Sequence, residues 1–164
     1  MKARCANPEK VRQKLEARQA RFVGTDHQVD TYFNAKTGRL KLREGTIENT
    51  LIHYHRPNQA GPKNSQVLLF KTAPNTSLKA LLTAALGVRI VVDKMRRIYF
   101  VENVKIHLDE VQQLGTFLEI EAIDETGTIG LERLEEQCRF YINLFGVKDG
   151  DLVRVSYSDM MEEL

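Results

Sequence analysis

Two glutamates in one alternating segment are the residues whose type and spacing point most directly to chemistry. The segment runs from Thr116 to Asp124 and reads TFLEIEAID. In a strand, Glu119 and Glu121 share one face, roughly 6.6 Å apart along the backbone. That spacing lets two carboxylates hold one divalent cation or flank a pair of them. An ordinary solvent-exposed strand face gives the same pattern, so the other segments must decide between the two interpretations.

Basic residues alternate in the same way along other predicted strands. Arg39, Lys41 and Arg43 lie two apart and are separated by leucines, so they share one face of a strand. Further basic and acidic residues at alternating positions are Arg56, Lys71, Lys94, Arg96, Lys105 and Asp109. Alternation alone does not say whether such faces point into the protein or into solvent.

Two observations favour the interior. Amphipathic helices need an apolar sheet surface to cover, and that surface is lost if the leucine faces are sealed inside a barrel. The charges are also sorted, because cations dominate the earlier strands whereas Asp109, Glu119 and Glu121 come from the last two. Burying unpaired cations is costly, so we expect a wet interior that holds an anion. A triphosphate fits: arginine and lysine bind its oxygens, and carboxylates hold a bridging divalent metal.

The elements that must position these residues follow from periodicity and turn signals. Helices are expected at residues 8–19, 77–86 and 129–145, and strands at residues 26–33, 39–44, 50–56, 65–72, 89–101, 104–110 and 116–124. The chain is expected to end in a short segment through Ser156 and Tyr157.

Composition limits the class of protein. A chain of 164 residues and 18.8 kDa is expected to form one domain. A net charge of +2 argues against a dedicated nucleic-acid or membrane-surface binder. Because the sequence contains neither a signal peptide nor a long apolar run, we expect a cytoplasmic protein. Cys5 and Cys138 are interpreted as free thiols, and His53 and His55 lack a third zinc ligand at a recognisable spacing.

An ordered set of segments resembles the CYTH superfamily of triphosphate tunnel metalloenzymes, which includes class IV adenylyl cyclases and thiamine triphosphatases. The likeness extends over nearly the whole chain and is closest to the class IV, CyaB-like branch. The segments are DTYF at 30–33, GRLKLREG at 38–45, YHRP at 54–57, VDKMR at 92–96, HLDEV at 107–111 and GTFLEIE at 115–121.

The resemblance implies a single CYTH domain over residues 1–164 of the α+β class. Its fold would be a closed eight-stranded antiparallel β-barrel with helices packed on the outside and a shortened first strand. By residue, it implies triphosphate binding by Lys41, Arg43, Arg56, Lys71, Lys94 and Arg96, metal binding by Glu119, Glu121 and Asp109, and catalysis by Lys2, Lys71 and Asp109. The implied metal is Mg²⁺ or Mn²⁺, and the implied state is a monomer or a homodimer.

The first strand departs from the family pattern. The family signature there is Glu-x-Glu-x-Lys, and Lys2 matches the closing lysine while both glutamates are missing. We expect a truncated start rather than a natural variant with weak metal binding. Three functions stay open: conversion of ATP to cyclic AMP and pyrophosphate, hydrolysis of thiamine triphosphate, inorganic triphosphate or nucleotides, and triphosphate binding without turnover. Their partner would be a small-molecule triphosphate, with neither nucleic acid nor membrane involved.

Overall fold

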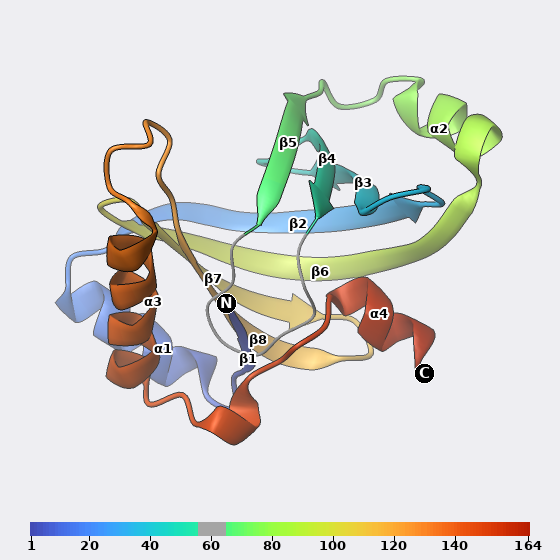
Figure 1. The fold of residues 1–164 in the computed structure, drawn as a ribbon. Helices are drawn as coiled ribbons and strands as arrows, with labels where there is room; N and C mark the ends of the chain where they lie inside the picture. The colour runs from blue at the N-terminus through green and yellow to red at the C-terminus, as the bar shows by residue number, and fades with distance from the viewer. Residues whose placement is uncertain (56–64) are drawn as a thin grey trace.

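The computed structural model describes residues 1–55 and 65–164. The described part of the chain is an α+β protein in which eight strands form one sheet (Figure 1). In chain order its elements are β1 (Lys2–Arg4), α1 (Pro8–Ala17), β2 (Arg21–Phe33), β3 (Arg39–Gly45), β4 (Thr50–His55), β5 (Gln66–Lys71), α2 (Leu78–Leu86), β6 (Val88–Val101), β7 (Val104–Val111), β8 (Gly115–Ala122), α3 (Leu131–Phe145), a 3-10 turn (Asp149–Asp151) and α4 (Tyr157–Glu162). None of the helices among these residues is both long and apolar enough to cross a membrane.

The helix ends follow from capping and glycine signals. Asn7 accepts a hydrogen bond from the backbone N–H of Lys10 at the start of α1, and Pro8 occupies the first helical position. Gly146 ends α3 in the left-handed conformation, with φ of 72°. The three predicted helices are therefore present, with ends shifted by up to two residues. Among the α-helices of the described residues, α4 alone is missing from the sequence prediction.

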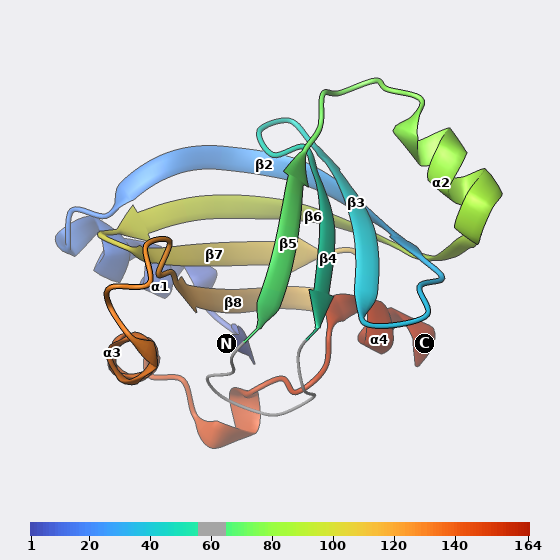
Figure 2. The ribbon, with the colours of Figure 1, turned by 45° about the horizontal axis from the view of Figure 1, so that its top comes forward.

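All strand pairs are antiparallel, in the order β1-β8-β7-β6-β2-β3-β4-β5. The sheet curls strongly, so that β3, β4 and β5 turn steeply away from the direction of β6, β7 and β8 (Figure 2). It remains an open half-barrel, however, with β1 and β5 as its two edges.

The prediction of a closed barrel is thus wrong, and the C-terminal segment supplies the reason. Ala3 forms an isolated antiparallel bridge with Leu152, and the N–H of Val153 donates to the carbonyl of Lys2 at 2.9 Å. The outer edge of β1 is therefore used by this segment and not by β5. Since β1 has only three residues, little of its edge is left for closure.

Helices α1 and α3 cover the convex face of the sheet, as expected from the apolar strand faces. Val11 and Leu15 of α1 and Tyr141 of α3 pack in one cluster with Ile106 of β7 and Ile120 of β8. Burial of these side chains removes the apolar stripes of both helices from water.

Helix α4 departs from the expectation that helices pack only on the outside. Its Tyr157 is buried with Tyr32, Val92 and Phe117, whose side chains belong to the concave face. This second cluster fills one end of the concave face, and the charged side chains occupy the rest.

Candidate functional site

The register of the sheet brings the predicted charged residues onto one face. Directly opposite residues in antiparallel strands point to the same side. Arg43 lies opposite Asp30, Arg96 lies opposite Asp109, and Glu119 lies between Lys2 on β1 and His107 on β7. All these side chains face the concave side, and each residue as a whole is at least nine-tenths buried. The predicted inward orientation is therefore found at these positions.

A buried aspartate stands at the centre of the basic residues. Asp30 on β2 accepts hydrogen bonds from Lys41 and Lys94, both at 2.7 Å, and from Arg43 at 2.8 and 3.0 Å. Burial acts to raise the pKa of Asp30, but the charges of Arg43, Lys41 and Lys94 outweigh it and hold the pKa well below its usual value. The carboxylate is therefore ionised and gathers three cations from three strands.

Lys94 is the most perturbed of these cations. Its side chain is fully buried, and burial lowers the pKa of Lys94 to about 7. Asp30 favours the charged form, whereas neighbouring Arg43 and Arg96 oppose it. An additional negative charge beside Lys94 would raise this pKa, so an anionic ligand and a proton are expected to bind together.

Arg96 connects the acidic residues. It donates to Asp109 at 2.7 and 2.5 Å and to Glu119 at 2.6 Å. Tyr157 donates its hydroxyl proton to Asp109 at 2.8 Å, and Lys2 lies 3.5 Å from Glu119. Burial acts to raise the pKa of Glu119, but Arg96 and Lys2 overcome it and hold the pKa well below its usual value.

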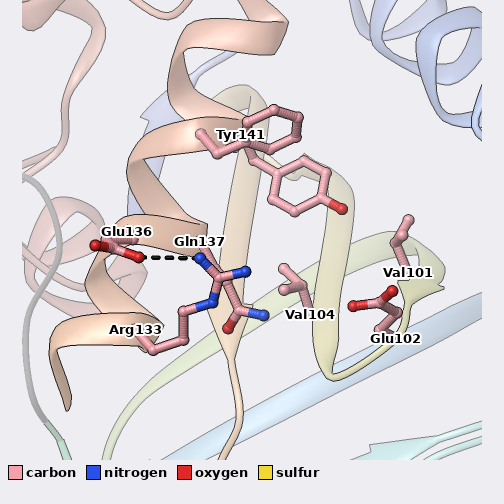
Figure 3. Close-up of a pocket in the computed structure, with 8 residues that line it drawn as sticks. Val101, Glu102, Val104, Arg133, Glu136, Gln137 and Tyr141 are labelled. Carbon is pink, nitrogen blue, oxygen red and sulfur yellow. Dashed lines mark hydrogen bonds and ion pairs between the residues drawn. The ribbon is translucent and has the colours of Figure 1, made fainter. Parts of the chain in front are cut away.

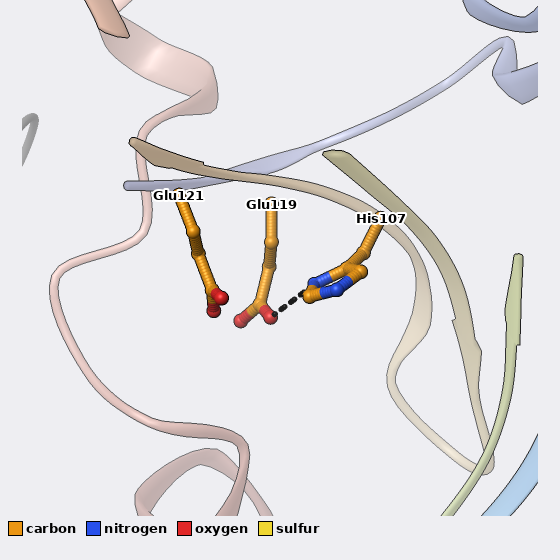
Figure 4. Close-up of side chains that lie close together, drawn as sticks. All are labelled: His107, Glu119 and Glu121. Carbon is orange, nitrogen blue, oxygen red and sulfur yellow. Dashed lines mark ion pairs between the residues drawn. The ribbon is translucent and has the colours of Figure 1, made fainter. Parts of the chain in front are cut away.

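Three donor groups converge beside this network. One potential ligand atom from each of His107, Glu119 and Glu121 lies within 4.8 Å of the other two, and their side chains extend in the same direction from β7 and β8 (Figure 4). Glu121 is exposed, unlike its two neighbours. Carboxylate oxygens are ligands that Mg²⁺ and Mn²⁺ accept, so the residues present fit the metal that the family resemblance implies.

Three acidic residues of the site, Asp26, Asp30 and Glu48, were not identified from the sequence. Asp26, fully buried, accepts hydrogen bonds from the backbone N–H groups of Ile47 and Glu48 at 2.8 and 3.0 Å. These bonds hold the turn between β3 and β4 so that Glu48 pairs with Lys105 at 2.5 Å and with Arg43 at 3.0 Å. The alternation of Asp26, Gln28 and Asp30 along β2 was a signal for Asp26 and Asp30, but Glu48 lies in a turn without periodicity.

The remaining predicted residues differ in burial and in position on the sheet. Lys105 is partly buried and opposite Glu121. Lys71 lies at the end of the edge strand β5, exposed, and opposite Thr50. Arg56 lies outside the described residues. The expected separation of a basic side from an acidic side is not observed, because Asp30 and Glu48 lie among the cations and Lys2 and Arg96 among the acids.

A hollow elsewhere on the molecule involves none of the predicted site residues. It has a volume of about 250 Å³ and lies between α3 and the turn that joins β6 to β7 (Figure 3). Its lining includes Glu102, Tyr141 and Arg133, which pairs with Glu136 at 3.0 Å. The charged network of the concave face therefore remains the candidate site.

Comparison with solved structures identifies the fold. The PH1012 protein from Pyrococcus horikoshii OT3 is 25% identical, with a TM-score of 0.77 over 96% of this chain and 95% of that chain. A Vibrio parahaemolyticus protein provisionally named an adenylate cyclase is 20% identical, with a TM-score of 0.75 over 99% and 95% of the two chains. The RNA triphosphatase Pct1 from S. pombe is 11% identical, with a TM-score of 0.52 over 94% and 71%.

Comparison of sequences identifies the family. Among curated proteins, none is significantly similar. The family model of the CYTH domain, however, matches residues 1–157, which confirms the resemblance seen in the sequence. Because this match includes every strand and the charged network of the concave face, the chain belongs to the CYTH domain family.

Proposed function

We propose that this protein is a metal-dependent enzyme that converts ATP to cyclic AMP and pyrophosphate. The observation that carries the proposal is the network of buried, mutually paired charges on the concave face. Arg43, Lys94 and Arg96 are all at least nine-tenths buried, and each is bound to a carboxylate. Such networks are weak sources of stability, since desolvation offsets most of the attraction. A role in binding a charged ligand explains their presence.

The pairing pattern suits a triphosphate that arrives with a divalent cation. The basic side chains would bind the phosphate oxygens, and Glu119 and Glu121 would hold the divalent cation, so the charges on both sets of residues would be balanced in the complex. Lys41, Arg43 and Lys94 converge on a single carboxylate, and the planar fork of Arg43 matches two phosphate oxygens. We assign these residues, with Arg96, to triphosphate binding.

Two carboxylates of the network are assigned to the metal. Glu119 and Glu121 would hold Mg²⁺ or Mn²⁺, with Asp109 beside them. When bound, the ion supplies neutralisation of the charge on the phosphate oxygens. Asp109 already accepts from Arg96 and Tyr157, so its own contribution is to hold Arg96 in place.

The chemistry then requires positioning and charge stabilisation. The ribose hydroxyl attacks the α-phosphorus and loses its proton to solvent water, the bond to the pyrophosphate oxygen breaks, and negative charge develops on the leaving group. Lys71, and Lys2 next to Glu119, are assigned to stabilise this charge. Arg56, beyond the described residues, stays in the proposed triphosphate set on the strength of the family resemblance alone.

Hydrolysis is the second candidate, and the position of Tyr157 favours it. Tyr157 packs edge-on against Phe117 with ring centroids 5.0 Å apart, and it fills the apolar end of the concave face. That end is thereby denied to a nucleobase. Inorganic triphosphate needs no base pocket, and thiamine triphosphate or a nucleotide could extend toward the open side of the sheet. Water replaces the ribose hydroxyl as the attacking group.

Product identification separates the candidates. The protein is incubated with ATP, thiamine triphosphate or tripolyphosphate plus Mg²⁺ or Mn²⁺, and products are followed by ³¹P NMR and chromatography. Cyclic AMP with pyrophosphate supports the cyclase, and orthophosphate supports the hydrolase. Binding without turnover indicates a non-catalytic triphosphate-binding domain. Glu121→Gln should abolish metal-dependent turnover, whereas Glu125→Gln, on the exposed segment after β8, serves as the control.

A further inference from the structure

A buried imidazole next to the two glutamates has no hydrogen-bonding role in the described structure. His107 on β7 is 1% exposed, and within residues 1–55 and 65–164 neither of its ring nitrogens has a hydrogen-bond partner. The nearest carboxylate oxygen, on Glu119, lies 3.5 Å from Nδ1. Buried polar groups form hydrogen bonds in the great majority of cases, so an imidazole whose nearest polar contact is a carboxylate oxygen at 3.5 Å is suited to a ligand.

The position of His107 places it in a convergent donor set. His107 is directly opposite Glu119 in the register of β7 and β8, and Glu121 follows two residues later on the same face. Figure 4 shows the imidazole and both carboxylates directed toward one region. Glu121 has neither an ion pair nor a hydrogen bond with another described residue, and its exposure leaves the group accessible from solvent.

We propose that His107 is a direct metal ligand together with Glu119 and Glu121, and that it makes this site prefer Mn²⁺ or a similar first-row transition ion over Mg²⁺. The inference rests on the proposed metal-dependent function and names the class of metal. Mg²⁺ prefers oxygen ligands and exchanges its water reluctantly, whereas imidazole nitrogen suits transition ions. A set of one nitrogen and two carboxylates therefore favours ions such as Mn²⁺, Fe²⁺ and Co²⁺.

The neighbouring ion pairs give metal binding a consequence for the anion site. Glu119 is balanced by Arg96 at 2.6 Å and by Lys2 at 3.5 Å. A cation that binds Glu119 replaces part of that balancing charge, so Arg96 and Lys2 become available to an anionic ligand. Metal and triphosphate are then expected to strengthen the binding of each other.

The first experiment uses a variant in which His107 is the only histidine. The sequence contains four histidines, and the other three, His27, His53 and His55, are exposed or partly exposed, so their replacement by glutamine should leave the fold intact. The untagged variant is titrated with Co²⁺, with and without tripolyphosphate, and followed by proton NMR. A directly coordinated imidazole gives a strongly contact-shifted N–H resonance. We expect that resonance; its absence in both conditions overturns the proposal.

The second experiment measures selectivity by titration calorimetry. In His107→Gln, Mn²⁺ affinity should fall by at least about tenfold while Mg²⁺ affinity changes much less, as expected for loss of a nitrogen donor. His53→Gln is the control. Equal losses for both metals, or none, contradict the inference even if triphosphate turnover is present. The two proposals can fail separately. If the contact-shifted resonance is observed but the protein neither binds nor converts a triphosphate, the metal site is supported and the proposed function is refuted.

Discussion

Replacement of Asp30 by asparagine is the perturbation for which the structure gives the clearest magnitude. The carboxylate is 1% exposed and accepts hydrogen bonds from Lys41, Arg43 and Lys94 within 3.0 Å. Asparagine keeps the shape and removes the charge, so three basic side chains lose their central counter-ion. Removal of one partner from a buried ion pair costs about 3–5 kcal/mol. For a domain of this size, that corresponds to a decrease in Tm of roughly 6–20 °C.

The same variant should bind polyanions more tightly. In the wild-type protein Asp30 competes with phosphate for the three cations, and in Asp30→Asn that competition is lost. Thermal unfolding followed by circular dichroism, with and without tripolyphosphate, measures both effects. The increase in Tm caused by tripolyphosphate should be larger in Asp30→Asn than in the wild type.

The control for Asp30→Asn is Asp93→Asn, because Asp93 is a partly exposed carboxylate on β6 that pairs with His27. Asp93→Asn should lower the stability by less than about 1 kcal/mol, as expected for an exposed pair. The reasoning is refuted if Asp30→Asn is as stable as this control and gains no additional stability from tripolyphosphate.

Three further predictions follow from the network. Arg96→Met should weaken triphosphate binding by at least about tenfold in calorimetry, because charged hydrogen bonds contribute about 1.5–3 kcal/mol. Arg97→Met, on the opposite face of β6, should leave the affinity unchanged. Equal losses of affinity in both variants would contradict the assigned face. Because the pKa of Lys94 is lowered to about 7, the unfolded chain binds more protons above that pH, so this group adds stability as pH rises from about 7 toward 10. In denaturant unfolding, the free energy of unfolding of the wild type should rise relative to that of Lys94→Met over that range. A constant difference between the two free energies would be inconsistent with a depressed pKa. An N-terminal extension with glutamate at the first and third positions upstream of Met1 would continue the pairing of β1 with β8. In that register the first glutamate lies opposite Glu121. The affinity for Mn²⁺ should rise in this variant, and an unchanged affinity would argue against that register.

The faces of the strands could be predicted from the sequence because alternation has a period of two. Arg43, Lys94, Arg96 and Glu119 all lie on the buried concave face, as the pairing of amphipathic helices with the leucine faces required. The helices were found because their caps and apolar stripes are local signals. The pair Ser156 and Asp159, which forms a capping box at the start of α4, was a local signal that went unused.

The parts that escaped prediction depend on contacts between distant residues. The open edge of the sheet follows from the pairing of Ala3 with Leu152, which no local pattern announces. Glu48 reaches the site only because Asp26 holds the turn that contains it. The separation of charges by sign was overestimated because buried cations need counter-ions nearby, and Asp30 supplies one within the basic group.

The most direct test of the account is a crystal structure of the protein with a non-hydrolysable ATP analogue and Mn²⁺. The account predicts the triphosphate on the concave face, in contact with Arg43, Lys94 and Arg96, and the ion on Glu119 and Glu121. A nucleotide bound elsewhere, with the ion pairs of Asp30 and Arg96 unchanged, would contradict it.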